Sequence, residues 1–211
     1  MTTSFKFVAL VTGATATTGM GILAFKGFSF SKDEKSISSL LSKDPSKRAI
    51  DITEIDYWKT AWASYKVSNK DFWNLGNGQD VPEGFKTACR DKLESKVSGV
   101  DSEDYQNFLS YCSRDTLISD LIKDSKLVPL SKTEADNTDG WKKAWESYID
   151  ANKEKLNNDD AWKVNNFKTE KDKKDKALAD FRDKCETNLG SKDISNTALF
   201  DQVKKWCTKK T

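Results

Sequence analysis

A ten-residue segment occurs twice in this chain, and the two copies lie 83 positions apart. Residues 56–65 read DYWKTAWASY and residues 139–148 read DGWKKAWESY, with seven identical positions. In both copies Trp, Ala, Trp and Tyr fall at positions i, i+3, i+4 and i+7, which lie on one face of an α-helix. A repeat constrains the fold strongly, because both copies are expected to form the same structural unit.

Three further blocks surround the two copies in the same order. ISSLLSKD (37–44) corresponds to ISDLIKD (118–124), and FKTACRDKLESK (85–96) corresponds to FRDKCETNLGSK (181–192). An aromatic residue also precedes a Cys at 111–112 and at 206–207. The repeats therefore cover residues 35–113 and 116–207. Their offset grows toward the C-terminus, which indicates an insertion of about a dozen residues around 151–177 of the second copy.

The spacing of apolar residues in these blocks predicts helices, and alternating strand-like runs are absent. We therefore expect an all-α protein with two tandem small helical bundles after an N-terminal membrane or signal helix. The repeated aromatic stripes are expected to fill the two cores, since these rings are the large apolar groups available. A ligand platform for sugars or bases is the alternative. The stripes contain Trp58, Trp62, Tyr65, Trp141, Trp145 and Tyr148.

The N-terminal segment, residues 1–30, differs in composition from the rest of the chain. Residues 7–25, from Phe7 to Phe25, carry no charge and are long enough to span a bilayer as a helix. The favoured interpretation is an uncleaved signal anchor, which makes the membrane a partner and exports the body. A signal peptide cleaved near Ala14-Thr15-Ala16 is a second interpretation. A buried core helix is a third, disfavoured because the segment lies outside the repeat.

The four cysteines lie in the repeats, two in each copy. The chain has no His and no C-x2-C motif, so a zinc site is poorly supported, and we expect no metal and no cofactor. If the ancestral unit was stable alone, its two Cys bonded each other, which predicts Cys89–Cys112 and Cys185–Cys207. Buried free thiols are the alternative. Disulfides persist in oxidising surroundings, which agrees with export.

Composition argues against several function classes. The absence of His removes Ser-His-Asp and Cys-His mechanisms in their usual form, and no acidic residue stands in an apolar context typical of a raised pKa. The net charge is +2, and residues 31–211 carry equal numbers of acidic and basic side chains. A nucleic-acid partner is therefore not expected, because such binders carry a basic excess.

The stretches ISSLLSKD, DYWKTAWASY and KKWCTKK, with the apolar N-terminus before them, resemble the uncharacterised paralogous protein families of haemotropic mycoplasmas. The resemblance covers nearly the whole chain, although tandem duplication is not a fixed feature of those families. It implies a cell-surface or membrane-anchored protein of a wall-less parasite, and it transfers no activity and no catalytic residues.

Together these features predict a membrane-anchored, outward-facing helical protein, not an enzyme, that interacts with a host surface component or varies antigenically. If the anchor were cleaved, the body would be secreted. A cytoplasm-facing scaffold with reduced cysteines is one alternative, and a carboxylate-based hydrolase is another.

Overall fold

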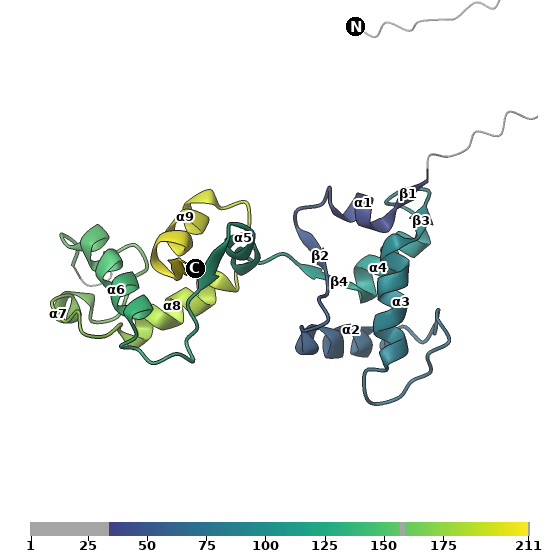
Figure 1. Ribbon diagram of the computed structural model, residues 1–211, viewed down its shortest axis with the longest axis horizontal. Helices are drawn as coiled ribbons and strands as arrows, with labels where there is room; N and C mark the ends of the chain where they lie inside the picture. The colour runs from purple at the N-terminus through teal and green to yellow at the C-terminus, as the bar shows by residue number, and fades with distance from the viewer. Residues whose placement is uncertain (1–33, 157–158, 211) are drawn as a thin grey trace, which may run out of the picture. The chain divides into compact units, whose positions relative to one another are not determined.

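The computed structural model describes residues 34–156 and 159–210 (Figure 1). The segment expected to enter the membrane, from Phe7 to Phe25, lies outside these residues. Within the two described ranges, every helix is too short or too polar to cross a bilayer.

The described chain is mainly helical, and its elements fall into two runs (Figure 1). The first half, residues 35–113, and the start of the segment that follows it contain β1 (Lys35–Ser36), α1 (Ile37–Leu41), β2 (Lys47–Ala49), α2 (Ile55–Val67), α3 (Glu83–Glu94), β3 (Lys96–Val97), α4 (Glu103–Tyr111) and β4 (Ser113–Asp115). The second half, residues 116–207, and the last strand contain α5 (Ile118–Asp124), β5 (Leu127–Pro129), α6 (Asp139–Asn152), α7 (Phe167–Glu170), α8 (Ala179–Leu189), α9 (Thr197–Trp206) and β6 (Thr208–Lys210).

The expectation of an all-α fold is wrong in one respect, because the structure contains short β-strands. They form antiparallel two-stranded sheets in which β1 pairs with β3, β2 with β4, and β5 with β6. Each strand has only two or three residues. A strand this short cannot produce the alternation of apolar and polar residues by which strands are recognised in a sequence.

The buried apolar side chains form two separate clusters, one in each half. The first extends from Ile37 to Cys112, and the second from Ile118 to Cys207. Polar side chains define where several of the contributing helices begin. The hydroxyl of Ser102 accepts the amide of Tyr105 at the start of α4, and that of Thr138 accepts the amide of Trp141 at the start of α6. Each cap determines the residue at which its helix begins, and the apolar face of each helix packs into a core.

A charged cluster stands where the first half ends. Arg114 is 9% exposed, and its guanidinium donates to Glu54 through Nε at 2.8 Å and to both carboxylate oxygens of Asp120 at 2.6 and 2.9 Å. Burial opposes ionisation of Asp120, but the hydrogen bonds from Arg114 and from the Leu117 amide outweigh it and lower the pKa of Asp120. The Arg114–Asp120 pair therefore stabilises the fold while Asp120 is ionised.

Replacing Asp120 by Asn is expected to cost about 2 kcal/mol of unfolding free energy at pH 7, because the charge-assisted pair is lost. The folded pKa of Asp120 lies below its unfolded value, so its stabilisation is complete above about pH 5 and is lost as the pH falls through the folded pKa. Urea unfolding at several pH values measures this. The difference between the native chain and the variant should be constant above about pH 5 and should shrink as the pH falls below the unfolded pKa toward the folded pKa of Asp120, and a difference that is the same at every pH would contradict the assignment.

Candidate binding groove

The six aromatic residues of the repeated stripes lie inside the two cores. None is more than 4% exposed. In the first half Phe85 packs against the rings of Trp58, Trp62 and Tyr65, and in the second half Phe181 packs against Trp141, Trp145 and Tyr148. The rings therefore cover one another, and at most 4% of any of the six is accessible.

The indole nitrogens of the repeated Trp residues donate to backbone carbonyls of the following or preceding loops. Trp58 Nε1 donates to the Asp51 carbonyl at 2.8 Å, and Trp62 Nε1 donates to the Gly78 carbonyl at 3.0 Å. The second half has the same pattern, with Trp141 donating to the carbonyl of Ser131 and Trp145 to that of Lys173. These bonds hold the loops on either side of the stripe. They also show that position 51 corresponds to position 131, and position 78 to position 173.

Each Tyr of the stripe organises a loop that the sequence analysis missed. Tyr65 Oη donates to Asp71 and accepts the amide of Trp73 at 2.8 Å, and the Leu75 amide donates to Asp71 at 2.7 Å. The hydrogen bond from the Leu75 amide lowers the pKa of Asp71, and this effect exceeds the opposing effect of burial.

The second half contains the same loop around Tyr148. Its hydroxyl donates to Asp160 and accepts the amide of Trp162 at 2.9 Å, while the Val164 amide donates to Asp160 at 2.8 Å. Burial, and then the hydrogen bond to Asp160, raise the pKa of Tyr148. The matching sequences are DFWNL (71–75) and DAWKV (160–164), so the insertion expected around 151–177 consists of two parts, one on each side of this loop.

The two loops differ in burial, and this difference gives a prediction. Asp160 is 2% exposed and its Oδ1 has no hydrogen-bond partner among the described residues, whereas Asp71 is exposed. Tyr148→Phe leaves the Trp162 amide without its partner and Asp160 with the Val164 amide alone, and it should cost about 2 kcal/mol. Tyr65→Phe should cost less than about 1 kcal/mol, because water can reach Asp71. Urea unfolding of both variants checks this, and equal losses would contradict it.

Two disulfide bonds are present, and they join the pairs that the sequence predicts. Cys89 of α3 bonds Cys112 after α4, and Cys185 of α8 bonds Cys207 after α9, with Cα–Cα distances of 5.3 and 5.5 Å. All four sulfurs belong to residues no more than 4% exposed. Each bond connects two helices of one half at the edge of its aromatic core.

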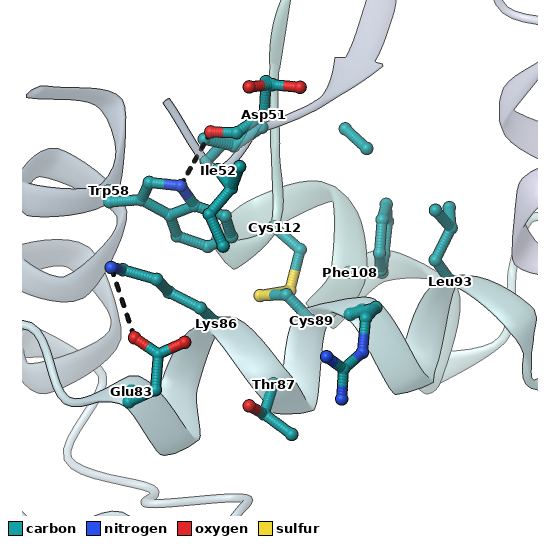
Figure 2. Close-up of a pocket in the computed structure, with 13 residues that line it drawn as sticks. Asp51, Ile52, Trp58, Glu83, Lys86, Thr87, Cys89, Leu93, Phe108 and Cys112 are labelled. Carbon is teal, nitrogen blue, oxygen red and sulfur yellow. Dashed lines mark hydrogen bonds and ion pairs between the residues drawn. A yellow bond between two sulfur atoms is a disulfide. The ribbon is translucent and has the colours of Figure 1, made fainter. Parts of the chain in front are cut away.

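The first half has a groove of about 270 Å³ beside its disulfide (Figure 2). One side is the chain from Ala49 to Ile52, and the other is the face of α3 that carries Lys86 and Leu93. Figure 2 shows the Cys89–Cys112 bond between Trp58 and Phe108. The lining is mostly apolar, since its residues include Ala49, Ile50, Ile52, Trp58, Leu93, Phe108 and the two half-cystines.

A second hollow of about 370 Å³ adjoins this groove and shares Trp58 and Lys86 with it. It extends along α2 past Trp62 to Lys66, and Val81 lies on its opposite side. Two Ile side chains at the rims are unusually exposed, Ile52 by 65% and Ile55 by 64%. We call the two hollows together the α2–α3 groove.

Four charged groups border the first hollow of the α2–α3 groove. Lys86 Nζ lies 3.4 Å from a carboxylate oxygen of Glu83, and the dashed line in Figure 2 marks this pair. Asp51 accepts hydrogen bonds from the hydroxyl and the amide of Thr53, which lower its pKa and keep it ionised. Arg90 pairs with its neighbour Asp91 and is exposed.

The corresponding surface of the second half is bridged by charged side chains. Arg182, at the position of Lys86, lies 5.2 Å from the centroid of the Trp141 ring and donates to the carbonyl of Glu134 at 2.6 Å. Lys132, at the position of Ile52, forms ion pairs with Asp183 and with Glu186. These contacts lie where the first half has its apolar lining.

A further bridge covers the continuation along the helix. Lys174 pairs with Glu146 at 3.0 Å, and these residues stand at the positions of Gln79 and Ala63. Both first-half residues line the second hollow of the α2–α3 groove. The surface beside the disulfide is therefore open and apolar in the first half, whereas ion pairs bridge the matching positions of the second half.

Comparison of the chain with protein-family models, with curated proteins and with solved structures finds no match in any of the three.

Proposed function

We propose that this chain is a membrane-anchored helical protein whose body faces outward and binds a ligand through the α2–α3 groove. The observation that carries the outward orientation is the pair of disulfide bonds, each buried in its own half. Such bonds indicate an oxidising environment, because cytosolic thiols are kept reduced. The uncharged stretch from Phe7 to Phe25 supplies the anchor in this proposal, and the resemblance to paralogous surface proteins supports display to a host component.

We further propose that the body consists of two tandem repeats of one stapled helical unit, residues 35–113 and 116–207. Matched contacts support this. Ile50 N donates to the Cys112 carbonyl and Leu130 N to the Cys207 carbonyl, at 3.0 and 2.8 Å. The amides of Ile37 and Ile118 likewise donate to Ser95 and Ser191, respectively. Such agreement in backbone contacts is unexpected for two unrelated small domains.

Protease treatment of intact cells tests the orientation. We expect the protease to degrade the body on intact cells. No fraction of the body should survive until the cells are lysed. Peptide mapping without reduction, on protein alkylated at lysis, should recover Cys89 linked to Cys112 and Cys185 linked to Cys207. A body that is cut only after lysis, or four alkylated thiols, would instead establish the cytoplasm-facing scaffold.

A further inference from the structure

We infer that the α2–α3 groove binds an anionic single-chain amphiphile of the fatty-acid type, with its hydrocarbon chain beside the disulfide and its carboxylate near the lysines of α2. This inference rests on the proposed function as a binding protein and names the ligand class of its groove.

The floor of the groove suits a hydrocarbon chain. Trp58 and Phe108 are 4% and 1% exposed, and with the Cys89–Cys112 bond they present an apolar surface at the bottom of the groove (Figure 2). Ile52, which is 65% exposed, stands at its rim and would lose much of its contact with water under a ligand. Burial of apolar surface on both sides supplies the driving force for binding.

Several hydrogen-bond donors around the groove are already used within the chain and are not free to bind a peptide. The indole N–H groups of Trp58 and Trp62 are already donated to carbonyls of the chain, and the Ile50 amide is donated to Cys112. An extended peptide would bring its own amide and carbonyl groups into an apolar groove, where they would lack partners. A hydrocarbon chain has no such requirement, and this favours an acyl ligand.

Positive charge gathers at the end of the groove along α2. Lys59, Lys66 and Lys86 line the second hollow, and Asp80 is the acidic residue there. Lys66 Nζ lies over the Trp62 ring at 5.7 Å and donates to the Gly78 carbonyl at 3.2 Å, so it is held at the groove by uncharged partners. Lys59 pairs with Asp56 as an exposed pair, and the half-buried Lys86 pairs with the exposed Glu83 at 3.4 Å; pairs of this kind contribute little and can rearrange. A carboxylate here complements the local charge.

Comparison with the second half indicates which residues leave the groove of the first half open. Ion pairs of Lys132 with Asp183 and of Lys174 with Glu146 bridge the equivalent surface. The first half has Ile52 and Thr87 at the positions of the former pair, and Gln79 and Ala63 at those of the latter. The scaffold can thus be closed by a few charged residues, and the first half lacks all of them.

Photolabelling tests the inference. The full chain, oxidised and reconstituted in phosphatidylcholine nanodiscs, is irradiated with a dodecanoic acid that carries a diazirine near its methyl end. We expect the label on the peptides that contain Leu93 and Phe108. The second-half peptides with Leu189 and Val203 serve as an internal reference and should carry about tenfold less.

Variants that exchange the closing residues sharpen the test. Ile52→Lys with Thr87→Asp should bridge the first-half groove and lower its labelling about tenfold. The matched control, Lys132→Ile with Asp183→Thr, should leave first-half labelling unchanged. Disulfide mapping and circular dichroism establish that both variants are folded.

A cationic probe tests the charge assignment without any substitution. Dodecylamine with the same diazirine should label the groove several-fold less than the acid. Three results would overturn the inference. They are equal labelling by the two probes, equal labelling of both halves, and loss of labelling when an acidic peptide without an acyl chain is present during irradiation. Labelling of purified protein does not depend on membrane orientation, so its failure is distinguishable from failure of the protease test on cells.

Discussion

Replacing Cys185 and Cys207 together by Ala is expected to lower the unfolding free energy of the second half by about 3 kcal/mol. The bond closes a loop with a sequence separation of 22 residues, and a loop of this length restricts the unfolded chain by about that amount in the chain-entropy model. Ala leaves no buried polar group unpaired, but it also removes two buried sulfur atoms, so lost packing adds to the effect of the crosslink.

The first-half bond provides the matched comparison. Cys89 and Cys112 have a sequence separation of 23, so their replacement by Ala should cost nearly the same free energy. The two clusters of buried residues are separate, which predicts that each double variant destabilises its own half. Hydrogen exchange with mass spectrometry along a urea series resolves the halves. Destabilisation of both halves by one lesion would show that they unfold as one unit.

The first-half variant has a second consequence that its counterpart lacks. The Cys89–Cys112 bond forms part of the floor of the α2–α3 groove. Its removal should therefore weaken fatty-acid labelling of the groove, whereas loss of Cys185–Cys207 should leave labelling unchanged. If the groove binds an acyl chain as inferred, stability and binding are coupled in the first half, where the groove lies beside the disulfide.

The elements that could be predicted from the sequence are those that the two copies share. The Trp58–Trp62–Tyr65 spacing identified a buried helix face, and the position of two Cys per copy identified their pairing. The short strands could not be predicted, because a pairing such as Lys47 to Asp115 brings together residues far apart in the chain. Nothing in a three-residue segment specifies such a partner.

The Tyr–Asp loops were detectable in principle. DFW and DAW follow the stripe in both copies, but their distance from it differs, and this obscures the match between Asp71 and Asp160. The groove was beyond reach for a different reason. It depends on positions where the copies differ, such as Ile52 and Lys132. A search for repeats finds the positions that agree and gives no information about those that differ. The structure places Ile52 at the groove and pairs Lys132 with Asp183 and Glu186, and these contacts are not visible in the sequence.

Truncation of Phe181 to Ala is expected to cost about 4 kcal/mol of unfolding free energy, among the largest losses of any single substitution in the second half. Phe181 is fully buried, and its ring lies within 6.2 Å of four others. Removing it leaves a cavity in the middle of an aromatic cluster, where large rigid rings cannot easily move to fill the space. The four rings belong to Trp141, Trp145, Tyr148 and Trp162.

Phe85→Ala is the matched variant in the first half. Phe85 is also fully buried, and it contacts Trp58, Trp62, Tyr65 and Trp73, the same four positions of the repeat. A similar loss of about 4 kcal/mol, confined to the first half in hydrogen exchange, is therefore expected. If two copies of one unit fold alike, two Phe residues that are equally buried among the same rings should lose similar free energies on truncation. A Phe85→Ala cost below about 1 kcal/mol would contradict that equivalence and with it the proposal of tandem repeats.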